Sequence, residues 1–202
     1  MEILYIILGW LLGIFSPSIQ KKISEKYEKD NLKKIIFNDL RDLKKRLAPL
    51  PFSIFPKYGK LDEEKFEWLK KNLDIDFSEG IQKMSEQGID LKMTLNNLNV
   101  IGLQKNTLTY FKKMHLFAID SHLTNLNLVD GLLMAKILEV RFHIEAFNED
   151  IDNFREHLKM TFQPGITDAN HKIISQELEN ISLDIAKKSI YIVDKINIIL
   201  EN

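Results

Sequence analysis

An unbroken apolar run near the start is the strongest hydrophobic pattern in the chain. Residues 3–15 contain no polar side chain except the hydroxyl of Tyr5. With Met1 and residues 16–19, the segment extends roughly 28 Å as a helix at about 1.5 Å per residue. The hydrocarbon core of a bilayer is about 30 Å thick. The pattern therefore predicts a single transmembrane helix over residues 1–19.

Three other structures can contain an apolar segment of this kind. A signal peptide has a positive start and a small-residue cleavage site, but here Glu2 is acidic and no A-x-A pattern follows. An interfacial helix has a polar face, which residues 3–15 lack. A buried core helix remains open at this length. The membrane span is the favoured interpretation.

A long amphipathic helix is predicted over residues 20–48. Apolar positions recur every three or four residues, and the sequence APLP at residues 48–51 ends the pattern. Pro17 favours a kink or a new helix start. The helix can stand as a stalk or lie along the membrane, but its apolar stripe favours packing on the folded body. The stripe consists of Ile19, Ile23, Tyr27, Leu32, Ile36, Leu40, Leu43 and Leu47.

Shorter elements are expected in the middle of the chain. Residues 49–61 contain three prolines and three aromatics, which predict a loop whose aromatic side chains dock into the fold, contact lipid or bind a partner; docking is favoured. Asp62 is expected to N-cap a short helix. Further short helices are predicted over residues 78–87 and 90–100, with breaks at Gly88 and Gly102. A longer helix is predicted over residues 105–126.

The clearest helical periodicity lies in the last third of the chain. Apolar residues from Leu133 to Leu158 recur in steps of four and three, which gives three heptads of an a/d seam. After a break at residues 163–165, Asp168 is expected to cap a second helix, whose seam Lys188 interrupts. Two such helices joined by a short turn form an antiparallel hairpin. We therefore predict an all-α cytoplasmic helical bundle over residues 62–202.

Charge is unevenly distributed, although the net charge is only −1. Residues 20–46 contain ten Lys and Arg against five Asp and Glu, and the part that follows is acidic. A basic segment beside an apolar terminus suits an anionic membrane surface, whereas nucleic-acid binding needs basic residues over the whole body. By the positive-inside rule, the N-terminus is predicted outside and the body in the cytoplasm. The general character of the chain suggests a bacterial inner membrane. The juxtamembrane lysines are Lys21, Lys22, Lys26, Lys29, Lys33 and Lys34.

Two glycines give the apolar segment a candidate contact face. Gly9 and Gly13 form a G-x-x-x-G pattern, and small residues one turn apart allow close helix association in lipid. The functional interpretation is self-association through this face. The alternative is that both are simply small residues within a span.

No pattern of catalytic or metal-binding residues is evident. The chain has no Cys, which excludes disulfides, thiolate catalysis and Cys-ligated metals, and it has no phosphate-binding glycine loop or serine-hydrolase elbow. His115 and His122 are expected on one helix face, but neither has a carboxylate or imidazole partner three or four residues away. We therefore predict a non-enzymatic protein without cofactor or metal.

One short string resembles a known catalytic motif. Residues 152–157, DNFREH, resemble the Arg-Asn-x-x-x-His motif of the HEPN ribonucleases, with Asn153 and His157 in the matching positions. Asp152 replaces the arginine that would handle a phosphate, so the resemblance implies a degenerate, inactive relative. A chance match on an exposed helix face is the favoured alternative.

The layout as a whole resembles small single-pass accessory proteins of bacterial phage-defence systems, such as those that accompany type VI-B CRISPR nucleases. Three functions follow as hypotheses. The first is a non-enzymatic, membrane-anchored protein that binds lipid through its anchor and binds itself or a protein partner through its bundle. The second is an oligomeric, pore-forming membrane effector, and the third is a degenerate RNA-associated bundle.

Overall fold

The computed structural model describes residues 2–73, 90–104 and 111–201, with the side chains of residues 2–16, 18, 103 and 104 outside that description. All regular structure in the described part is helical, without a strand, so the all-α prediction is confirmed. The helices in chain order are α1 (Glu2–Leu47), α2 (Leu50–Ile54), η1 (Pro56–Tyr58), α3 (Glu63–Asn72), α5 (Leu91–Gln104), α6 (Phe117–Ser121), η2 (Leu123–Leu128), α7 (Gly131–Met160) and α8 (Asp168–Leu200).

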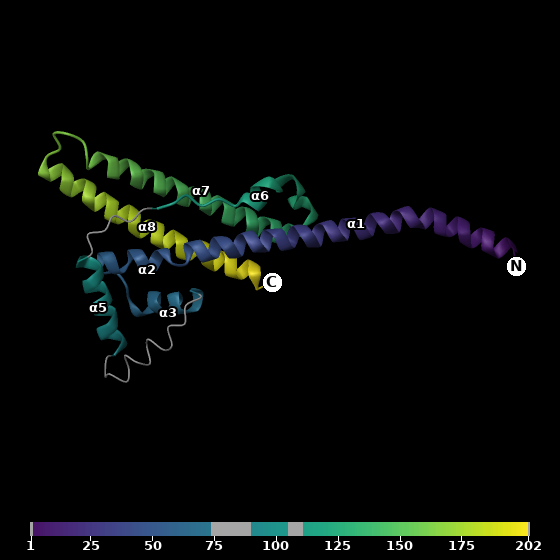
Figure 1. Cartoon of the computed structure of the whole chain (residues 1–202), viewed down its shortest axis with the longest axis horizontal. Coiled ribbons are helices and arrows are strands. Elements are labelled where there is room, and N and C mark those ends of the chain that lie inside the picture. Colours follow the sequence, from purple (N-terminus) through teal and green to yellow (C-terminus); the bar gives the residue numbers. More distant parts are fainter. Residues whose placement is uncertain (1, 74–89, 105–110, 202) are drawn as a thin grey trace.

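Helices α7 and α8 form the predicted antiparallel hairpin, which is the largest helix–helix contact in the described structure (Figure 1). The a/d seam of α7 is buried, because its apolar residues recur at the spacing that keeps one face toward the partner. Its buried residues are Ile137, Val140, Ile144, Phe147, Ile151 and Phe154. The helix cap of α8 differs from the prediction, since the Thr167 hydroxyl, and not Asp168, accepts the backbone N–H of Asn170.

Polar groups within the hairpin have partners on the same or the facing helix. The hydroxyls of Ser182 and Ser189 are buried and donate to backbone carbonyls three or four residues earlier. Lys188, which interrupts the seam, extends to Asp150 of α7, with 2.6 Å between Nζ and Oδ2. A second pair joins Lys195 to Glu139, and their hydrogen bond raises the pKa of Lys195 and lowers the pKa of Glu139.

From Leu32 onward, α1 packs on this hairpin, whereas residues 19–31 of the same helix are exposed. Leu32, Ile36, Leu40, Leu43 and Leu47 are buried. Ile19, Ile23 and Tyr27 are exposed. On a helix of 3.6 residues per turn, those three lie about 140° around the axis from the buried stripe. The prediction of one stripe along residues 19–47 is therefore wrong, because the sequence contains two stripes on different faces.

The backbone of α1 continues without interruption from Glu2 to Leu47, with Pro17 inside the helix. The segments predicted as 1–19 and 20–48 are thus parts of one helix. Among the residues described with their side chains, no helix is both long and apolar enough to cross a membrane. The side chains of residues 1–16, on which the predicted span depends, lie outside the described residues.

Residues 49–61 are more ordered than the predicted loop. They contain α2 and η1, because Pro49 and Pro51 fit the first turn of a helix, where the missing N–H leaves no bond unmade. Phe55 is fully buried in the core, so the expected docking of an aromatic side chain is confirmed for this residue. The aromatic side chain of Tyr58 packs partly against the core and donates its hydroxyl to Ser182 of α8.

Helices α3 and α5 lie beside this segment. Asp62 caps α3 as predicted, by accepting the N–H of Lys65. Gly102 does not end a helix as predicted, because α5 continues through it and there meets the backbone of Pro56. The side chain of Asn99 bonds both backbone groups of Leu61, which fixes α5 to the segment before α3. The helix predicted over residues 78–87, and the break at Gly88, lie outside the described residues.

The single helix predicted over residues 105–126 is wrong for residues 111–116, and only residues 117–121 form an α-helix in the described part of that range. Residues 111–116 have no regular structure and are followed by α6 and η2. The side chain of Asn148 on α7 bonds both the N–H and the C=O of Met114, replacing the bonds that a helix would supply. Asp39 of α1 accepts the N–H groups of Ala118 and Ile119 at the start of α6. The bonds from Asn148 hold Met114 in a non-helical path, and those from Asp39 fix the start of α6.

Candidate functional site

The first described part of α1 projects from the bundle as a single helix (Figure 1). All residues from 19 to 31 are exposed. The exposed fractions of Ile19, Ile23 and Tyr27 are 54%, 64% and 73%, which are high for apolar side chains one turn apart. We call residues 19–31 the stalk.

The structure gathers four of the six predicted juxtamembrane lysines on one side of α1. Helical spacing places Lys22, Lys26, Lys29 and Lys33 within about 60° of one another. None of these four lysines has a carboxylate partner among the described ion pairs. Of the six predicted lysines, only Lys21 forms a described ion pair, with Glu25 at 3.9 Å. Lys34 lies apart from this row. The row is about 90° around the helix from Ile19, Ile23 and Tyr27.

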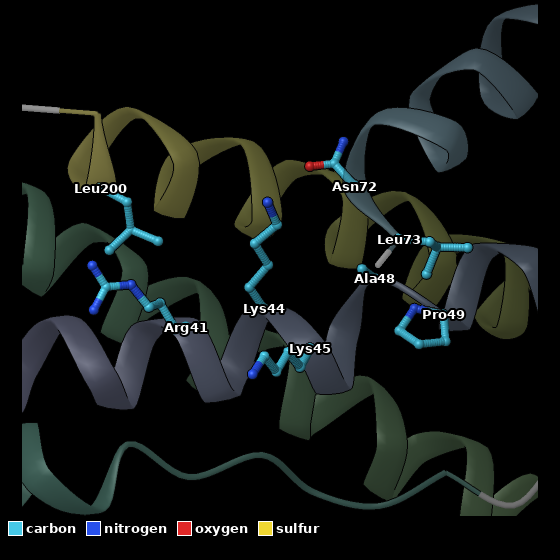
Figure 2. A pocket seen from close by; sticks show the side chains of 8 residues that line it. All are labelled: Arg41, Lys44, Lys45, Ala48, Pro49, Asn72, Leu73 and Leu200. Carbon is cyan, nitrogen blue, oxygen red and sulfur yellow. The ribbon is translucent and has the colours of Figure 1, made fainter. Parts of the chain in front are cut away.

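A basic pocket lies at the other end of α1 (Figure 2). Its volume is about 450 Å³, and its walls come from α1, the chain just after it, the end of α3 and the end of α8. The lining residues are Arg41, Lys44, Lys45, Ala48, Pro49, Asn72, Leu73 and Leu200. Sequence reasoning missed this pocket, although the excess of basic residues up to Arg46 was a visible signal.

The cations of the basic pocket have no acidic neighbour in its lining. Arg41 donates to the Oδ1 of Asn38 at 3.1 Å, and no described ion pair includes Arg41, Lys44 or Lys45. Asn72 is buried, with its amide donating to the carbonyl of Trp68 and its Oδ1 accepting from Asn197. The charged side of the pocket is therefore formed by α1 alone.

A second hollow of about 490 Å³ adjoins the basic pocket through Arg41. Residues of α1 line it, including Lys33, Lys34 and Phe37. The ammonium of Lys33 lies over the ring of Phe37, 5.1 Å from its centre. The two hollows share Arg41, and cationic side chains line both, with Asp30 as the acidic residue in the second.

The residues of the HEPN-like string, 152–157, contact their own helix and the non-helical segment 111–116. Asn153 is exposed, and its carbonyl oxygen lies 2.8 Å from Nδ1 of His157 on the same helix. Asp152 pairs with Lys113, and Arg155 donates to the carbonyl of Phe111 at 3.0 Å. These contacts fasten residues 111–116 to α7.

The histidines are not arranged as predicted. His115 lies in the non-helical segment and His122 follows α6, so the two do not share a helix face. The described residues contain no group of three or more His, Cys, Asp or Glu side chains that could hold a metal ion.

Gly9 and Gly13 lie on the helical backbone of α1, where side-chain surroundings are outside the described residues, so the G-x-x-x-G contact stays a prediction. Comparisons with protein-family models, curated proteins and solved structures find no match to this chain.

Proposed function

We propose that this chain is a non-enzymatic interaction protein, held at the cytoplasmic face of a bacterial inner membrane by the first part of α1. The observation that supports the proposal is the course of α1. This helix packs on the bundle from Leu32 onward, and before Leu32 it continues as an exposed stalk toward the apolar residues 3–15. An unbroken helix gives a stiff connection between an anchor and a folded body.

The row of four lysines on α1 supports both the attachment to a membrane and the proposed orientation of the chain. Each Lys near an anionic lipid surface contributes about 1 kcal/mol of attraction, and the row of four lysines can face such a surface together. Lysines after an apolar span favour the cytoplasmic side. The apolar stripe of the stalk, Ile19, Ile23 and Tyr27, would enter the interface if the stalk tilts toward the bilayer.

The outer surface of the hairpin supports a protein-binding role for the bundle. Phe142, His143 and Tyr191 form a chain of ring contacts across α7 and α8, with ring-centre distances of 5.5 and 4.6 Å. Phe142 is 64% exposed and Tyr191 is 42% exposed. Exposed aromatic residues are frequent anchors in protein interfaces.

Thiol labelling tests the proposal, because the chain contains no Cys and an introduced thiol is unique. Two single variants are required, Glu2→Cys and Lys71→Cys, the second at an exposed position of α3. In intact spheroplasts, a membrane-impermeant maleimide should label the first variant and leave the second unlabelled until lysis. Labelling of Lys71→Cys before lysis would contradict the orientation, and recovery of both variants in the soluble fraction would contradict the anchor.

A second candidate is an oligomeric membrane effector that forms or gates a pore. The observation that favours it is the exposed stripe of Ile19, Ile23 and Tyr27, which a second copy of α1 could cover. The test is the mass of the protein in detergent together with dye release from vesicles. Two double variants should each lower the mass of the assembly and the release of dye. They are Gly9→Ile with Gly13→Ile, and Ile19→Ser with Ile23→Ser. A monomer that leaves vesicles intact would exclude this candidate.

A further inference from the structure

We propose that the basic pocket is a binding site for a phosphate-bearing ligand. The proposal stands on Arg41, Lys44 and Lys45 and on the surrounding helix ends, and does not depend on the membrane anchor. It also differs from an attraction of α1 to lipid through its row of four lysines, because none of those lysines lines this pocket.

The three cations converge because of their spacing. Residues three and four apart lie on the same helix face, so Arg41, Lys44 and Lys45 project from adjacent turns of α1. In Figure 2, Lys44 points into the space between Leu200 and Asn72, whereas Arg41 and Lys45 lie at its edge. Lys44 is half-buried, and the other two are exposed and open to an entering anion.

The positive charge of the pocket exceeds what the fold itself needs. Helices α1, α3 and α8 all end here, and a helix C-terminus is equivalent to about −0.5 of a unit charge. Three such ends offset about half of the charge of three cations. The adjacent Glu201 is exposed and does not line the pocket. The remaining positive charge favours an anion, and a guanidinium fits two phosphate oxygens at once.

The size and lining of the basic pocket indicate a small molecule. Ligand pockets typically have volumes of about 300–1,000 Å³, and the volume of about 450 Å³ falls in that range. The lining also includes Ala48, Pro49, Leu73 and Leu200, which offer an apolar surface beside the cations. A ligand that combines a phosphate with an apolar or aromatic group meets both sides.

The phosphate could come from a soluble compound or from a lipid headgroup, and helix length favours the soluble source. Lys44 is 25 positions after Ile19, about 38 Å along a helix at about 1.5 Å per residue. If residues 1–19 span the bilayer with α1 upright, headgroups do not reach the pocket. Lipid would reach it only with α1 lying along the surface.

Calorimetric titration of the full chain in neutral detergent tests the site, with inorganic pyrophosphate as the probe. Wild type should bind saturably, and Arg41→Gln with Lys44→Gln should weaken binding at least tenfold. Lys45→Gln, at an exposed position that folding tolerates, should weaken it about threefold. The matched control is Arg46→Gln, which removes one charge from the same helix but lies outside the pocket, and it should bind within twofold of wild type.

A parallel titration with nanodiscs distinguishes the two sources of phosphate. Nanodiscs containing phosphatidylglycerol should bind wild type and the Arg41→Gln, Lys44→Gln variant equally if the ligand is soluble. A loss of nanodisc binding by the double variant, in addition to its loss of pyrophosphate binding, would assign the site to a lipid headgroup, and the phosphate chemistry would stand. Absence of saturable binding to both probes, or equal pyrophosphate binding by wild type and the double variant, would overturn the proposal.

Discussion

At the scale of single residues, Gly102 of α5 lies directly against the backbone of η1. A Cβ at this position would be 2.3 Å from both the carbonyl carbon and the oxygen of Pro56. Backbone atoms cannot move aside as a flexible side chain can. The sequence suggested a helix break at this glycine, but the structure uses its lack of a side chain for close packing.

Gly102→Ala should therefore lower the free energy of unfolding by about 1–3 kcal/mol, the usual cost of overpacking. The matched control is Gly131→Ala, at the first position of α7, where a Cβ would meet nothing within 4 Å. That change should be neutral or slightly stabilising. Denaturant unfolding followed by circular dichroism measures both, and equal stability of the two variants would contradict the close approach.

Asp39 is a second residue whose role depends on a distant segment. Its carboxylate accepts two backbone N–H groups at the start of α6, at 3.0 and 3.3 Å. Asp39→Ala should reduce stability by about 1–2 kcal/mol, as the loss of a helix cap does. The control Asp42→Ala, one turn along and exposed, should change it by less than about 0.5 kcal/mol. Comparable losses in the two variants would refute the capping role.

At the scale of elements, sequence prediction succeeded where a local periodicity determines the helix. It failed where hydrogen bonds to distant residues determine the path of the backbone. The a/d spacing of α7 predicted its buried face directly, since the six seam residues from Ile137 to Phe154 are all buried. Residues 111–116 were predicted as part of a longer helix, but they have no regular structure. Their actual path depends on bonds from Asn148 and Arg155 of α7, which no local pattern connects to them.

The pair of Lys188 and Asp150 gives a prediction for the hairpin. Lys188→Met leaves the Asp150 carboxylate, whose side chain is 18% exposed, without its cation. Breaking a fully buried pair costs about 3–5 kcal/mol, and the partial exposure here should reduce that to about 1–3 kcal/mol. Adding Asp150→Leu to Lys188→Met should recover most of the lost stability, because no unpaired charge remains.

Thermal unfolding of the single and double variants measures this effect. The control is Lys187→Met, which removes a charge from the exposed side of α8 and should leave the midpoint almost unchanged. A double variant no more stable than Lys188→Met would contradict the argument, since stability would then depend on packing of the lysine stem rather than on the charge.

At the scale of the whole molecule, the course of α1 connects the folded body to the apolar end. The sequence predicted both a lysine-rich flank and a long helix, because charge and apolar spacing are local properties. It did not predict where α1 leaves the bundle, because the stripe of residues 19–27 and the stripe of residues 32–47 have the same period. The two stripes differ only in their angle around the helix axis. That difference separates the stalk from the packed part of α1, and it becomes visible once the buried face is known. The basic pocket was missed for a similar reason, since it forms where three helix ends meet.

Alkaline carbonate extraction of cell membranes tests the central claim, anchoring through residues 1–19, most directly. Wild type should stay in the membrane pellet. The variant Leu8→Lys with Leu12→Lys should move to the supernatant, because each Lys near the middle of a span costs about 3 kcal/mol. The control Lys70→Leu with Lys71→Leu, on α3, should remain in the pellet like wild type. Release of the wild-type protein into the supernatant would contradict the account.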